Sequence, residues 1–87
     1  MPRISTFYGI TVWMYHDEGG HAVPHVHARY AGQFVSVGIE GNVLAGGVPA
    51  RALRLIQEWM ALHADEVLAN WRRARAGEPL LPIPPLA

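Results

Sequence analysis

Short segments rich in β-branched and aromatic residues fill the first half of the chain, and turns of two or three residues separate most of them. Parallel strands need a crossover of a dozen or more residues, so segments joined this closely must pair antiparallel. The pattern therefore predicts a meander of three or four antiparallel strands. The candidate strands, with the short alternation that precedes them, are Ile4–Phe7, Ile10–Tyr15, Val26–Tyr30, Gln33–Ile39 and Val43–Ala45.

The sequence changes to a helical period after Pro49, which suits the first position of a helix. The segment Ala50–His63 then places Leu53, Ile56 and Met60 on one stripe. This apolar face is wide enough for the helix to pack on the sheet and to touch a second helix.

A second helix is expected over Glu66–Ala76, with Asp65 as its N-cap and Gly77 at its C-terminal end. Because Ala64 does not break a helix, one long bent helix is the alternative to two. The last ten residues include four prolines, which exclude a helix or a central strand. They predict an extended segment that lies against the domain or against a partner.

Strands followed by helices predict an α+β fold, in the form of a small two-layer domain. The 87 residues suit a single domain over 1–87, with a sheet half at about 4–46, a helical half at about 49–76 and an extended tail over 77–87. A chain of this length buries a modest core, so self-association into a homo-oligomer or a protein partner would help to stabilise it.

Composition narrows the classes of partner and site. Seven arginines, no lysine and seven acids give a net charge of zero, which argues against a surface devoted to nucleic acid but leaves room for a local patch. Without cysteine, metal ligands would have to be His, Asp or Glu. The N-terminal residues lack a signal-peptide core and no apolar run reaches membrane-spanning length, so we expect a soluble cytoplasmic protein.

Ionisable side chains concentrate between His16 and Tyr30, where four of the five histidines lie. Residues two apart on a strand point to the same face, so His25, His27 and Arg29 should share one face. Val26, Ala28 and Tyr30 should share the other. The first face is polar and basic at every position, so it either faces water, as sheets of two-layer domains do, or lines a site.

Two kinds of site fit this face. A metal such as zinc would take His25 and His27 as ligands, with a third ligand from His16, Asp17 or His21. A metal-free RNA-cleaving site would use histidines as general acid and base, because their ordinary pKa of about 6.5 suits both roles. The candidates for that chemistry are His25, His27 and His16, with Arg29 to stabilise the phosphate and with Asp17 and Tyr30 as nearby binding groups.

A second basic group follows Trp71 on the last expected helix. Arg72, Arg73 and Arg75 can hold phosphates or an acidic partner. Cations near the C-terminus of a helix also interact favourably with the helix dipole and then need no ligand. We favour this second interpretation, and we expect Trp13, Trp59 and Trp71 to anchor the core or an interface.

Several motifs occur in one continuous order from Ile4 to Leu86. They are Phe7-Tyr8-Gly9, Met14-Tyr15, Pro24-His25 with His27 and Tyr30, Glu58-Trp59 with His63, Asn70-Trp71 and Gly77-Glu78-Pro79-Leu80. In these residues the chain resembles the family catalogued as domain of unknown function 4160. One segment departs from the family pattern, which usually has a compact acid-rich turn with adjacent prolines where this chain has Glu18–Val23.

The resemblance implies a small prokaryotic protein that is often encoded beside another small domain, domain of unknown function 2442, in an arrangement similar to toxin–antitoxin pairs. It therefore predicts a toxin-like component of a two-gene module, with the neighbouring small protein as partner and RNA as a candidate target. The alternatives are a protein-interaction module without catalytic activity and a metal-binding protein with histidine ligands. Whether the chain is an enzyme stays open at this point.

Overall fold

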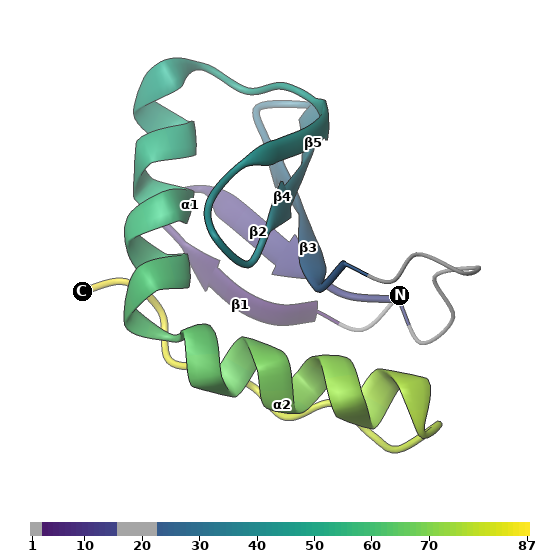
Figure 1. Ribbon diagram of the computed structural model, residues 1–87. Coiled ribbons are helices and arrows are strands. Elements are labelled where there is room, and N and C mark those ends of the chain that lie inside the picture. The colour runs from purple at the N-terminus through teal and green to yellow at the C-terminus, as the bar shows by residue number, and fades with distance from the viewer. Residues whose placement is uncertain (1–2, 16–22) are drawn as a thin grey trace.

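The computed structural model describes residues 3–15 and 23–87. A five-stranded antiparallel sheet in the order β1-β2-β3-β4-β5 precedes two helices, which confirms the α+β prediction and corrects the expected three or four strands (Figure 1). The elements are β1 (Arg3–Phe7), β2 (Ile10–Trp13), β3 (His25–Tyr30), β4 (Gln33–Gly38), β5 (Val43–Gly46), α1 (Ala50–Leu62) and α2 (Ala64–Arg75).

The additional strand is β1, which the sequence showed only as a short alternation. Tyr8 and Gly9 have φ values of 49° and 78°, and two successive positive values are those of a type I′ turn. This turn folds β1 directly back on β2, so that Phe7 pairs with Ile10. Tyrosine is a rare residue at such a position, which is why the sequence did not predict a hairpin here.

The core lies between one face of the sheet and α1. The alternation of β2, β3 and β4 turns Val12, Ala28 and Val35 to this face, where all three are buried in register with one another. Ile56 and Trp59 of α1 pack against the same cluster. Burying a side chain such as that of Ile56 contributes about 1.5–3 kcal/mol, so the α1 face supplies much of the stability.

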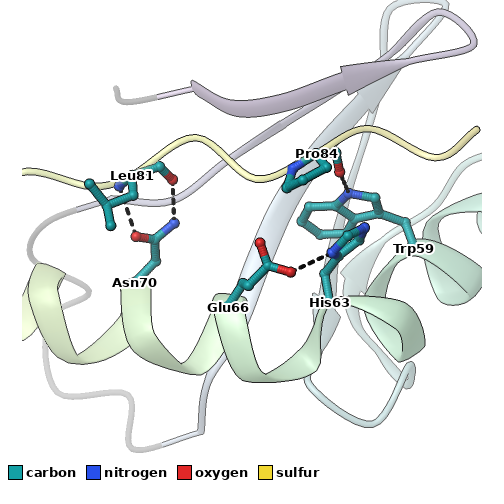
Figure 2. A network of polar contacts seen from close by, with 6 residues as sticks. All are labelled: Trp59, His63, Glu66, Asn70, Leu81 and Pro84. Atoms are coloured by element: carbon teal, nitrogen blue, oxygen red, sulfur yellow. Dashed lines mark hydrogen bonds and ion pairs between the residues drawn. The ribbon is translucent and has the colours of Figure 1, made fainter.

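The helical half contains two helices rather than one bent helix. The backbone of His63 leaves the helical region at φ −120°, and its ring pairs with Glu66 at 2.6 Å (Figure 2). The N-cap of α2 is therefore His63, and Asp65 lies in the first turn of α2, so the expected N-cap is wrong. Neither described helix has the length and apolarity needed to cross a bilayer.

The end of α2 agrees with the expected stop at Gly77, which has φ 73°. Glu78 N donates to Arg73 O and Gly77 N donates to Ala74 O, the two bonds of a Schellman motif. The chain beyond it has neither helix nor strand and runs along α2 (Figure 1). Ile83 is buried, and its N–H donates to Ile4 O on β1.

Candidate functional site

One row of side chains crosses four strands on the face of the sheet that points away from α1. The register aligns Trp13 of β2 with His27 of β3, then with Ser36 of β4 and Ala45 of β5. These residues alternate with the buried core residues of the same strands, so they belong to the opposite face. We call this surface the open face.

Aromatic rings gather around Trp13 on the open face. Its ring stacks on His27 at a centroid distance of 5.7 Å and meets the edge of Phe34 at 6.1 Å. Tyr15 completes the group at 4.7 Å from His27. Trp13 at the centre is only 5% exposed, whereas Phe34 is 57% and Tyr15 37% exposed. The cluster thus has a buried centre and an accessible rim.

A hollow of about 300 Å³ opens beside this cluster. Trp13, Tyr15, His27 and Phe34 form its aromatic wall, and Val35, Ser36 and the end of β5 form the rest. Concave, mainly aromatic surfaces with a few polar groups are typical of ligand sites. The hollow can therefore accept a planar apolar group.

The indole N–H of Trp13 is an unsatisfied donor. Nε1 is buried and makes no hydrogen bond with any residue that the structure describes. A buried donor without an acceptor typically costs about 1–3 kcal/mol, so such groups are rare and often mark functional positions.

The two histidines of the strand motif lie side by side, with ring centroids 5.2 Å apart, as the alternation predicts. Their environments differ. His25 is only 5% exposed, its ring packs against Trp71 of α2, and Nδ1 donates to Val23 O at 2.8 Å. His27 is half-buried and shares a hydrogen bond with Ser36 Oγ at 3.2 Å. A ligand on the open face therefore meets His27 rather than His25.

Arg29 also lies on the open face, as expected. It is exposed, and the register places it between Thr11 and Phe34. A cation thus stands directly beside the most exposed ring of the aromatic cluster. Tyr30 belongs to the opposite face, where its hydroxyl accepts a hydrogen bond from Arg51 Nη2 at 3.3 Å.

None of the three arginines of α2 is among the described residues that line the hollow on the open face. Arg73 Nη1 donates to Pro79 O at 3.4 Å, so this side chain contacts the C-terminal segment. Arg72 and Arg75 are exposed in the last turn of the helix, where a cation favours the dipole.

The metal hypothesis takes its third ligand from residues outside the described ranges. His16, Asp17 and His21 lie outside the described residues, so the structure leaves the third ligand open. Within residues 3–15 and 23–87, no three His, Asp or Glu side chains come together. His25 and His27 remain as a pair of imidazoles to which a third ligand would have to be added.

Sequence reasoning did not find Phe34 as a site residue and took Trp13 only as an anchor. The alternation of side chains along a strand places Trp13 and Tyr15 on one face and turns Phe34 to the face opposite Val35. It carried no information on which face of one strand meets which face of the next. That link comes from the register of β2, β3 and β4.

A family model described as Domain of unknown function (DUF4160) matches residues 9–72, which include all of β2 to α1 and most of α2. No curated protein and no solved structure matches the chain.

Proposed function

We propose that this chain, which belongs to the family Domain of unknown function (DUF4160), binds single-stranded RNA on the open face of its sheet. The observation that carries the proposal is the exposed ring of Phe34 beside the cation of Arg29, at the rim of the aromatic hollow. Unpaired bases stack on aromatic side chains of sheet surfaces, and arginine neutralises the adjacent phosphates.

The geometry favours single strands over duplexes. A duplex hides the faces of its bases, so rings on a protein surface can stack only on bases that are already unpaired. Phe34 and Arg29 are direct cross-strand neighbours, a pairing that typically places Cβ atoms about 5 Å apart. One nucleotide can then stack on Phe34 while its phosphate contacts Arg29.

We place binding ahead of cleavage. A metal-free nuclease needs two proton-transfer groups within hydrogen-bond reach of the substrate. His27 meets this condition on the open face, whereas His25 is buried and donates its Nδ1 proton to Val23 O. His27 is therefore proposed as a contact to the base or ribose.

The toxin-like role in a two-gene module is proposed on the family resemblance together with this surface. A toxin that binds RNA would need a small protein partner to restrain it, and the neighbouring domain of unknown function 2442 is the candidate. We expect that partner to inhibit the toxin by competing with RNA for the open face.

A protein-interaction module is the second candidate, because one edge of the sheet is open. All four residues of β5 are exposed and uncharged, and Val43 and Leu44 are large apolar residues among them. Edge strands of this kind accept a further strand from a partner. The C-terminal segment, by contrast, donates a hydrogen bond to β1 at the other edge.

The test is the affinity for a short single-stranded RNA, measured by fluorescence anisotropy at several salt concentrations. Phe34→Ala should weaken binding by about 5- to 150-fold, since one base stack is worth about 1–3 kcal/mol. Arg29→Gln should lower the salt slope by about 0.7, the value for one phosphate contact on a single strand.

Two exposed positions on the helices provide matched controls. Leu62→Ala and Arg72→Gln remove an exposed apolar side chain and an exposed cation away from the open face, and both should bind like the wild type. Equal affinity of Phe34→Ala and wild type would refute the proposal. If the RNA is cut, and the cutting disappears in folded His27→Gln, the chain is a nuclease instead.

A further inference from the structure

A second hollow, of about 450 Å³, lies on the other side of the sheet at its turn end. Tyr8, Tyr30, Arg51, Ala52 and Leu55 line it, so it lies between the β1–β2 turn and the beginning of α1. We call it the turn-end hollow. Its volume falls in the range of small-molecule sites, and no role assigned above uses it.

Arg51 supplies the turn-end hollow with a positive charge that no carboxylate among residues 3–15 and 23–87 neutralises. Its guanidinium donates to the Tyr30 hydroxyl at 3.3 Å and makes no ion pair with any described residue. Arg54, one turn further along α1, is likewise exposed. The first turn of α1 has no acidic residue, so nothing in that turn opposes these cations.

The described acids lie toward the opposite end of the molecule. Antiparallel pairing brings the turns at 8–9 and 31–32 to one end of the sheet, whereas β4 runs away from that end to Glu40. Glu58 lies seven residues after Arg51, about 10 Å along the helix. Asp65 and Glu66 follow on α2, and Glu78 lies beyond the end of that helix. The turn-end hollow therefore attracts anions.

Tyr8 combines a strained backbone conformation with an exposed aromatic ring. Its φ of 49° is a conformation that bulky residues rarely adopt, yet the side chain is 59% exposed and gains little from burial. Asparagine or glycine would suit this turn position better. The turn allows β1 to pair with β2, but the tyrosine side chain itself gains no packing, and this is a reason to look for a functional role of the ring.

We propose that the turn-end hollow binds an anion that carries a planar ring, of the nucleoside monophosphate class. The ring would lie against Tyr8 and Tyr30 over the apolar floor of Ala52 and Leu55, and Arg51 would hold the phosphate. This site does not rest on the proposed function, because the open face lies on the other side of the sheet.

The same chemistry can come from a free mononucleotide or from the 5′-phosphorylated end of an RNA. Two pairs of probes separate these sources: adenosine monophosphate against adenosine, and 5′-phosphorylated against 5′-hydroxyl RNA of one sequence. Binding is followed by NMR through the amide signals of Tyr8, Gly9 and Arg51.

Adenosine monophosphate should saturate these signals and bind about tenfold more tightly than adenosine, which corresponds to one charge-assisted contact. Arg51→Gln should remove this preference, while Arg72→Gln, an exposed arginine on α2, should retain it. Tyr8→Asn should weaken both ligands several-fold without lowering Tm, because asparagine fits the turn. Phe34→Ala should bind adenosine monophosphate like the wild type.

If the wild type prefers 5′-phosphorylated RNA and Arg51→Gln does not, the ligand of the site is an RNA end. If the wild type shows no such preference, the ligand is the free nucleotide. Equal affinities for adenosine monophosphate and adenosine, or an unchanged preference in Arg51→Gln, would overturn the proposal. These failures leave the effect of Phe34→Ala on RNA binding untouched, so the two sites are tested separately.

Discussion

The side-chain amide of Asn70 connects α2 to the C-terminal segment through two hydrogen bonds, one from its N–H group and one to its oxygen (Figure 2). Nδ2 donates to Leu81 O at 2.8 Å, and Oδ1 accepts from Leu81 N at 2.9 Å. The side chain is only 1% exposed. Asn70→Ala would remove both hydrogen bonds and leave unfilled volume beside α2.

The two hydrogen bonds contribute about 1 kcal/mol each. Leu81 is half exposed, so water can take over part of its hydrogen bonding, and the lost volume adds a further cavity cost. The free energy of unfolding should fall by about 2–3 kcal/mol in total. For a chain of this size each kcal/mol lowers Tm by about 4–8 °C, so Tm should drop by roughly 8–24 °C.

Urea unfolding and thermal melts measure this loss, and hydrogen exchange locates it. The Leu81 amide should exchange faster in Asn70→Ala than in wild type, because its acceptor is gone. Arg72→Ala, an exposed change on the same helix, should stay within about 0.5 kcal/mol of wild type. A loss below about 1 kcal/mol in Asn70→Ala, or unchanged exchange at Leu81, would show that the amide does not hold the segment.

Three further changes test the fold. Gly46→Ala should lower the free energy of unfolding in urea by about 2 kcal/mol or more, because its Cβ would lie 2.3 Å from Phe34 O at a φ of 71°. Gly47→Ala is the control and should be close to neutral, since its Cβ would meet no atom within 4 Å. Equal effects of the two substitutions would contradict the register of β4 and β5. Trp59→Phe removes the 2.9 Å hydrogen bond to Pro84 O, so it should lower the free energy of unfolding by about 1 kcal/mol or more and lower Tm with it; an unchanged Tm would argue against that bond. Ile56→Val should cost about 0.5–1.5 kcal/mol if the α1 face is the main core, and no loss would indicate loose packing there.

Local sequence chemistry was sufficient for the types of element and the faces of the strands. The period of two predicted that His25 and His27 share a face with Arg29, and the structure places them so. Tight turns required antiparallel pairing, and Gly77 marked the end of α2 through its positive φ. These features depend on neighbours within a few residues, so the sequence contains all the information they need.

The strand count and the helix cap required more than local pattern. Arg3–Phe7 became a fifth strand because Tyr8 adopts a positive φ against its own preference, and pairing with β2 compensates for that conformation. His63 rather than Asp65 is the N-cap of α2, and the last turn of α1 before it is joined to the C-terminal segment by the hydrogen bond from Trp59 Nε1 to Pro84 O. In both places a tertiary contact overrides a residue preference.

The composition of the candidate site was decided by tertiary structure alone. Alternation assigns a side chain to a face, but only the register brings Trp13 beside His27 and Phe34 beside Arg29. Packing of α2 buries His25 under Trp71, although its strand position is equivalent to that of His27. The sequence by itself determined which residues of each strand share a face. Long-range pairing decided which of them are neighbours and which a ligand can reach, because those contacts join residues far apart along the chain.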